Sequence, residues 1–104
     1  QMEMTYCAEQ GWQKADAELN AAYKKAMAAM KETDSYLPKE MQGAVEALRG
    51  AQRAWIPYRD KACEAYGFQA RGGSMEPMLI YGCLATLTAQ RTEELKELAS
   101  GLGN

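Results

Sequence analysis

Two carboxylates of this 104-residue chain, Asp60 and Glu94, have the chemistry of a general acid and base pair. Both lie near arginines, because Arg59 precedes Asp60 and Arg91 lies one helical turn before Glu94. The alternative is structural: Asp60 and Glu94 would pair with Arg59 and Arg91 as partly buried, bidentate ion pairs that hold a second helix to a third, in a polar network that includes Arg53. Since nothing else in the sequence resembles a substrate site, we favour the structural interpretation and expect no enzymatic activity.

The chain contains no histidine, which removes Ser-His-Asp and Cys-His catalysis and the usual zinc ligand sets. Its seven methionines suggest Cu(I) instead, because thioether and thiolate groups suit this soft ion. Methionines at helical spacing usually fill a core, however, so we expect no metal or other cofactor. The sulfur groups in question are Met2, Met4 and Cys7, then Met27 with Met30, and Met75 with Met78.

Length and charge narrow the class of protein further. A chain of 104 residues is expected to form one domain, residues 1–104, around one core. The net charge of −2 and the mixed charges lack the basic footprint of a nucleic-acid binder. No apolar run approaches the roughly 18 residues that a membrane span needs, so we expect no membrane-spanning segment.

Three cysteines in a small domain suggest at least one disulfide, and therefore an oxidising compartment. The first residue is Gln1 rather than methionine, from which we expect a processed chain whose export signal has been removed. The predicted location is the periplasm or the cell exterior. An odd number of cysteines leaves one thiol without a partner.

Apolar residues recur every three or four positions in three segments, which predicts three helices. The first covers residues 5–31 and ends at the turn-rich segment 33–38. The second begins near Pro38 or Lys39 and continues to about residue 66, with a kink expected at Pro57. The third begins at Ser74 as N-cap, with Pro77 in its first turn. Together they predict an all-α, up-down-up bundle.

In such a bundle Cys7, Cys63 and Cys83 all fall near one end, and geometry alone allows any pairing. Cys63 with Cys83 joins sequence neighbours across a short connection, and closing that loop is worth roughly 3 kcal/mol. Counting residues from this pair, the third helix should extend about 9 Å beyond the second, and residues 67–73 should project as a lobe. The alternative is a plain stapled hairpin with a mobile loop.

The glycine-rich segment 67–73 carries the candidate partner-binding residues. Arg71 is a lone cation there, close in sequence to Phe68 and Gln69. Loop side chains on a rigid support often carry binding function. A solvated loop arginine is the simpler alternative.

Two blocks around the last cysteines, residues 51–63 and 72–95, with residues 4–7, 15–20 and Tyr23, resemble the LprI-like lysozyme-inhibitor N-terminal domain family. Its members are small exported bacterial proteins. The resemblance implies a helical, exported domain with four cysteines: it supports a Cys63–Cys83 disulfide and puts the partner of Cys7 upstream of Gln1. Pro57 departs from the family pattern, in which helix-compatible residues occupy that region.

The resemblance also implies the leading functional hypothesis, an exported lysozyme inhibitor. It would act by occlusion, placing the stapled end or residues 67–73 in the lysozyme cleft, with Arg71 near the catalytic carboxylates. The sequence pI of 5.2 favours a cationic partner. One alternative is an envelope interaction or stress-related module with another partner. A Cu(I) carrier ranks third and an enzyme last.

Overall fold

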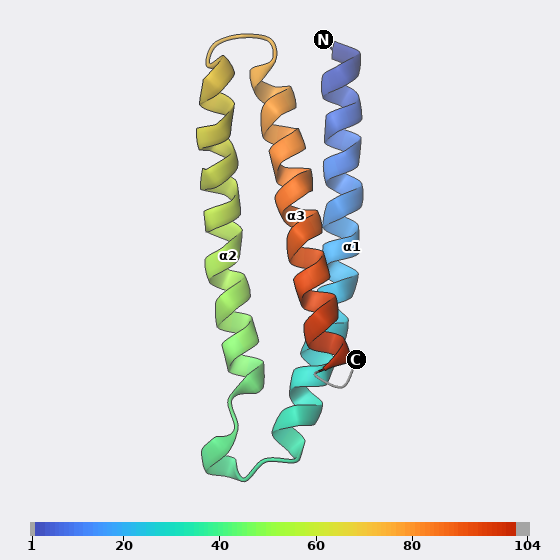
Figure 1. Ribbon diagram of the computed structural model, residues 1–104, viewed down its shortest axis with the longest axis vertical. Helices are drawn as coiled ribbons and strands as arrows, with labels where there is room; N and C mark the ends of the chain where they lie inside the picture. Colours follow the sequence, from blue (N-terminus) through green and yellow to red (C-terminus); the bar gives the residue numbers. More distant parts are fainter. Residues whose placement is uncertain (1, 102–104) are drawn as a thin grey trace.

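Three long helices, joined by two short connections, make up the fold. The computed structural model describes residues 2–101, which form α1 (Met2–Ser35), α2 (Ala44–Gly67) and α3 (Glu76–Ser100), with single 3-10 turns η1 (Lys39–Met41) and η2 (Phe68–Ala70). The chain runs along α1, returns along α2 and reverses again in α3, so the predicted all-α, up-down-up arrangement is confirmed (Figure 1). The bundle is long and thin, measuring 55 × 20 × 17 Å.

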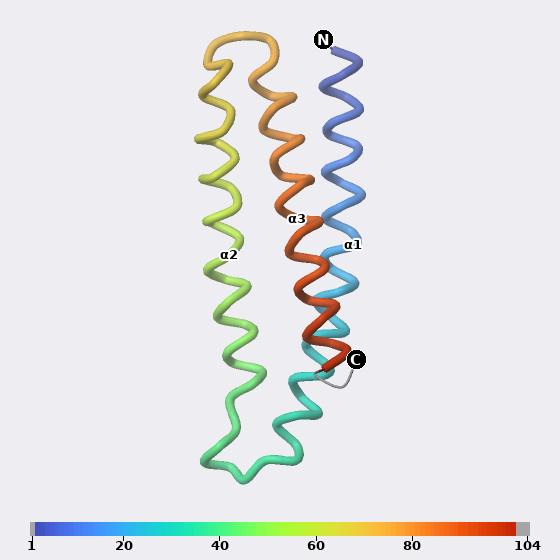
Figure 2. Tube along the Cα trace, viewed as in Figure 1, coloured from blue at the N-terminus to red at the C-terminus, as the bar shows by residue number. Residues whose placement is uncertain are grey.

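The hydrophobic core is small and lies well away from the disulfide. α1 supplies Leu19, Ala22 and Ala26, while α2 adds Leu48 and α3 adds Leu95. Because the two alanines are small, α1 and α3 approach closely, and α1 packs along α3 more extensively than α2 packs against either helix. Figure 2 shows the α3 trace beside α1 over much of its length, with α2 on the other side.

The start of α2 corrects the sequence-based prediction of a helix from Pro38 or Lys39. Only a single 3-10 turn forms at Lys39–Met41, and Gln42 is extended. α2 begins at Ala44 because the carboxylate of Asp34, at the end of α1, accepts hydrogen bonds from the backbone N–H groups of Gly43, Ala44 and Val45 at 3.0, 2.9 and 3.2 Å.

Asp34 should make the stability of this connection depend on pH. Its hydrogen bonds from Gly43, Ala44 and Val45 hold the pKa of Asp34 below its ordinary value. The stabilisation is therefore present above the ordinary aspartate pKa of about 4 and disappears as the pH falls through the lower, folded-state value. We expect Asp34→Ala to lower Tm at pH 7, and the difference from wild type to shrink on acidification to about pH 2.

Thermal unfolding followed by circular dichroism at several pH values measures this effect. Glu40→Ala, which removes an exposed carboxylate from the same connection, is the matched control and should leave Tm nearly unchanged at pH 7. An Asp34→Ala deficit that stays constant from pH 7 to pH 2 would contradict a role for the ionised carboxylate.

Pro57 does not end the second helix. α2 continues through it without interruption to Gly67, and the chain then tightens into η2. The helical segments on both sides of the proline are part of one continuous ribbon in Figure 1.

The ends of α2 and α3 are level, so the predicted 9 Å overhang of the third helix is wrong. Helical structure continues for seven residues beyond Cys63, to Ala70, and α3 begins seven residues before Cys83, at Glu76. The connection consequently arches across the two helix ends instead of rising to one of them (Figure 1).

The predicted N-cap at Ser74 is also wrong. Met75 is the residue before α3, and it provides no side-chain cap. Ser74 lies inside a turn in which the backbone N–H of Glu76 donates to the carbonyl of Gly73 at 3.3 Å. Pro77 does occupy the first helical turn, where its missing N–H costs nothing.

Candidate functional site

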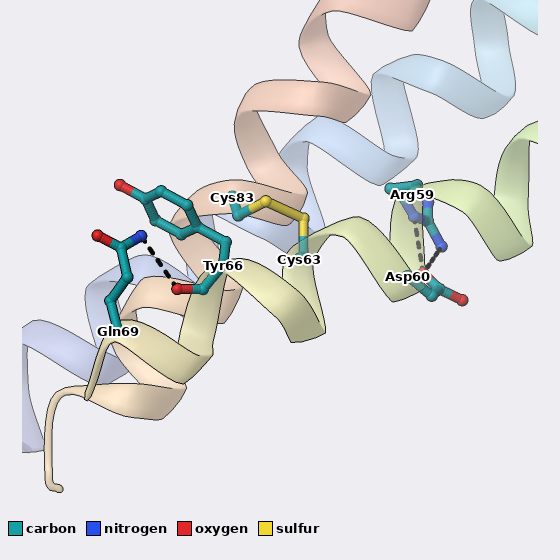
Figure 3. Close-up of a disulfide and its surroundings, with 6 residues drawn as sticks. All are labelled: Arg59, Asp60, Cys63, Tyr66, Gln69 and Cys83. Atoms are coloured by element: carbon teal, nitrogen blue, oxygen red, sulfur yellow. Dashed lines mark hydrogen bonds and ion pairs between the residues drawn. A yellow bond between two sulfur atoms is a disulfide. The ribbon is translucent and has the colours of Figure 1, made fainter. Parts of the chain in front are cut away.

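A disulfide between Cys63 and Cys83 joins α2 to α3, as predicted, with the two Cα atoms 5.4 Å apart. Cys63 is fully buried. Figure 3 shows the bond crossing between the two helices, with Tyr66 one turn further along α2. The start of α1 reaches the same end of the bundle (Figure 1). We call this end, comprising the disulfide, residues 67–76 and the first turns of α1, the stapled end.

The connection at the stapled end is ordered by its own side chains. The guanidinium of Arg71 donates to Oε2 of Glu76 at 3.1 Å and stacks over the ring of Phe68, 4.6 Å from its centroid. The backbone N–H of Gly72 donates to Oε1 of the same carboxylate at 3.1 Å. Gly72 has φ 83°, a backbone conformation that side chains disfavour. Arg71 is therefore held in place while 64% of its side chain stays exposed.

The pKa of Glu76 reflects the same contacts. The hydrogen bond from the backbone N–H of Gly72, followed by the one from Arg71, holds the pKa of Glu76 below its ordinary value. Glu76 is therefore ionised at neutral pH and keeps the Arg71 guanidinium oriented. A carboxylate in the first turn of α3 is also favoured by the helix dipole.

The three candidate partner-binding residues from the sequence, Arg71, Phe68 and Gln69, come together along one shallow surface hollow. Their orientations differ. Arg71 and Phe68 form the stacked pair, whereas the amide of Gln69 turns back and donates to the carbonyl of Tyr66 at 3.2 Å (Figure 3). All three residues remain exposed at the surface.

Exposed apolar side chains surround this connection, and sequence reasoning missed most of them. Tyr6 and the start of α3 line a common surface hollow, which shows that α1 contributes to the stapled end. Large exposed apolar residues are more numerous here than at the opposite end, where Tyr36, Met41 and Leu98 are the examples. Their signal in the sequence was weak, because helical periodicity identifies the buried face and ignores the exposed one. They are Met2, Met4, Tyr6, Tyr66, Phe68 and Met75.

Arg59, about one turn before Cys63 on α2, contacts side chains of α1. Its buried guanidinium lies over the rings of both Trp12 and Trp55, 4.7 and 5.1 Å from their centroids. It also donates to Asp60 at 2.9 Å and forms a longer ion pair with Asp16 at 3.9 Å. The predicted Arg59–Asp60 pair exists, but it lies within α2, so the prediction that it holds the second helix to the third is wrong.

Arg91 provides the polar link between α2 and α3, through a partner that the sequence interpretation missed. Its Nε donates to Oε1 of Gln52 at 3.0 Å, whereas its ion pair with Glu94, at 2.9 Å, stays within α3. Arg53 is exposed and lines the surface groove between α1 and α2. Glu94 is too exposed and too close in sequence to its arginine to bridge helices.

Asp60 and Glu94 do not form an acid and base pair. Asp60 lies one turn from the disulfide along α2, and Glu94 lies three turns from it along α3. At 1.5 Å per residue they are about 12 Å apart along the bundle, beyond the roughly 5–9.5 Å of paired catalytic carboxylates.

Some of the methionines lie against the hydrophobic core, whereas others and Cys7 lie on the surface of the helices. Met27 and Met30 pack against the hydrophobic core, as the core-filler interpretation predicts. Met2 and Met4 are exposed, and Cys7 is a free, exposed thiol on α1. Within residues 2–101, no group of three or more His, Cys, Asp or Glu side chains is placed to hold a metal ion.

Fold and site define a small, disulfide-stapled helical protein with an ordered loop and apolar side chains at one end. The chain belongs to the family described as lysozyme inhibitor LprI, whose model matches residues 1–95. It is 56% identical over 107 residues to an uncharacterized protein of Rhizobium meliloti (strain 1021), covering 100% of this chain and 77% of the relative. The described helices include none long and apolar enough to cross a membrane.

The fold is also that of a solved structure. The crystal structure of a DUF1311 family protein from Pseudomonas putida KT2440 superposes with a TM-score of 0.82 over 96% of this chain and 94% of that chain, at 23% sequence identity. This likeness supports the three-helix arrangement.

Proposed function

We propose that this chain is an exported, non-enzymatic binding protein that inhibits a lysozyme by occluding its cleft with the stapled end. The observation that carries the proposal is the family match over residues 1–95. The disulfide supports export to the periplasm or the cell exterior, because such bonds persist in oxidising compartments.

The stapled end has the physical properties that occlusion requires. Phe68, Arg71 and Glu76 order the connection before any partner arrives, which lowers the entropic cost of binding. Exposed apolar side chains around it supply area to bury. The Arg71 guanidinium, still largely exposed, suits a cleft lined by the two carboxylates of a glycoside hydrolase.

The test is lysozyme activity against a cell-wall substrate, titrated with the disulfide-intact protein. Stoichiometric loss of activity, abolished when the disulfide is reduced, is the expected result. The net charge of −2 gives a modest attraction to a cationic lysozyme, so inhibition should weaken somewhat as salt is added.

Arg71→Gln tests the proposed contact most directly. Glutamine keeps a hydrogen-bond donor near Glu76 but removes the charge and the stacking on Phe68. If Arg71 is an interface hot spot, we expect the inhibition constant to rise about tenfold or more. Lys39→Gln makes the same charge change in η1, at the opposite end of the bundle, and should leave inhibition unchanged.

Equal inhibition by wild type and Arg71→Gln would remove Arg71 from the model. No inhibition by the wild-type protein of any of several lysozyme types would favour the alternative function, an envelope interaction module. In that case a different protein should dominate capture from a periplasmic extract.

A further inference from the structure

A second candidate site lies away from the stapled end, in a groove between α1 and α2. The groove encloses about 470 Å³, within the range typical of small-ligand sites. Leu19 and Ile56 are apolar, and the other lining residues have polar or charged groups on side chains that also contribute apolar surface. This groove exists because α2 packs less closely on α1 than α3 does.

The cations of the groove are all arginines. The chain has five arginines and seven lysines. Arg49, Arg53 and Arg59 line the groove, and no lysine does so among residues 2–101. A fourth arginine, Arg91, reaches the groove's Gln52 from α3. Arginine is the residue best suited to planar oxyanions, because its guanidinium presents paired donors to two oxygens at once.

The arginines differ in how far they are already neutralised. Arg59 is paired with Asp60 and, at 3.9 Å, with Asp16, the one carboxylate of the groove lining. Arg49 forms an exposed ion pair with Glu46 one turn earlier on α2. Arg53 lies on the same face as Arg49, four residues further along the helix, and is the exposed cation available to a ligand.

Gln52 supplies a buried donor at the back of the groove. The residue is only 8% exposed, and its Oε1 accepts the hydrogen bond from Arg91 at 3.0 Å. This contact fixes the orientation of the amide and leaves its NH₂ group free to donate. Gln52 is among the residues that line the groove, so its amide lies within reach of a ligand bound there.

We propose that the α1–α2 groove binds a carboxylate group, held by the guanidinium of Arg53 and the amide NH₂ of Gln52, with Arg49 beside them. Part of the site is preorganised, because Arg91 orients Gln52 before any ligand arrives. Asn20 and Tyr23 on the α1 wall add further hydrogen-bonding groups, which suits a carboxylate carried on a hydroxylated ligand. This inference does not rest on lysozyme inhibition.

The test is a titration of the whole ¹⁵N-labelled chain, at constant ionic strength, with succinate, glucuronate, inorganic phosphate and neutral glucose. The signals to follow are the side-chain NH₂ of Gln52 and the Nε–H of Arg53. We expect saturable shifts with succinate or glucuronate, and at least a tenfold weaker affinity in Arg53→Gln. Lys61→Gln, the same charge change at an exposed position of α2 outside the groove, should bind within twofold of wild type.

Each outcome of the titration either supports or overturns the proposed carboxylate site. Tighter binding of glucuronate than of succinate supports the proposed site and identifies an acidic sugar as the ligand that carries the carboxylate. Equal or tighter binding of succinate also supports the site and identifies a small organic acid as that ligand. Shifts that do not saturate, that appear only with phosphate, or that weaken equally in Arg53→Gln and Lys61→Gln would overturn the proposal. Since Arg53 is exposed, unchanged thermal unfolding of Arg53→Gln is expected and confirms that the comparison is between folded proteins.

Discussion

Replacing both Cys63 and Cys83 with alanine is expected to lower the free energy of unfolding by about 3 kcal/mol. The cysteines are 20 residues apart in sequence, so the disulfide closes a loop whose entropy the unfolded chain would otherwise regain. The hydrophobic core, centred on Leu19, Leu48 and Leu95, lies about 20 Å along the bundle from this bond and cannot compensate. Tm should fall by more than about 10 °C.

Urea unfolding measured by circular dichroism quantifies this loss. Cys7→Ala, which removes a free and exposed thiol from the same end of the molecule, should change the unfolding free energy by less than about 0.5 kcal/mol. If the free energy of unfolding of the double variant is within 1 kcal/mol of the wild-type value, packing alone holds the stapled end together. Lysozyme inhibition, if located at the stapled end, should disappear in the double variant and persist in Cys7→Ala.

Gly67→Ala is expected to destabilise the protein by about 1–3 kcal/mol, although alanine is the better helix former. Gly67 is the last residue of α2 and is buried against α3. An added Cβ would lie 2.6 Å from Cγ1 and 3.0 Å from Cδ1 of Ile80. Ile80 cannot easily rotate away, because a β-branched side chain in a helix has one strongly preferred χ1 rotamer.

Gly50→Ala is the matched control on the same helix. A Cβ there meets nothing within 4 Å, so the variant should be more stable than wild type by about 0.5–1 kcal/mol. Combining Gly67→Ala with Ile80→Ala should recover part of the loss, and urea unfolding of the four proteins gives the coupling energy. Stabilisation by Gly67→Ala, or no coupling with Ile80, would contradict the close approach of α2 and α3.

Helical periodicity was enough to predict the number, order and direction of the helices. The ends were less predictable, because they depend on contacts between segments. α2 begins where the Asp34 carboxylate, on the preceding helix, reaches the N–H groups of Gly43 and Ala44. Nothing in the local sequence around Pro38 indicates that partner. The level ends of α2 and α3 likewise depend on η2, a tightening that adds three residues of helical structure.

The same distinction between local signals and contacts between distant segments applies to the candidate sites. Sequence reasoning predicted the disulfide, and it proposed Phe68, Gln69 and Arg71 as partner-binding candidates, because spacing and loop composition are local signals. It assigned the wrong role to Arg59 and missed Gln52. Their contacts join residues far apart in the chain: Arg59 meets Trp12, and Gln52 meets Arg91. Periodicity shows which face of a helix is buried, but not which residue of another helix lies opposite.

The stacking of Arg59 has a spectroscopic consequence. Trp12 and Trp55 are the two tryptophans of the chain, and both rings lie against the same guanidinium. Intrinsic tryptophan fluorescence therefore reports on one place, the contact of α1 with the middle of α2, and is largely blind to events at the loop. A partner that binds residues 67–76 without separating these helices would leave the emission spectrum almost unchanged. A titration in which tryptophan emission does not change is therefore no evidence that the partner does not bind.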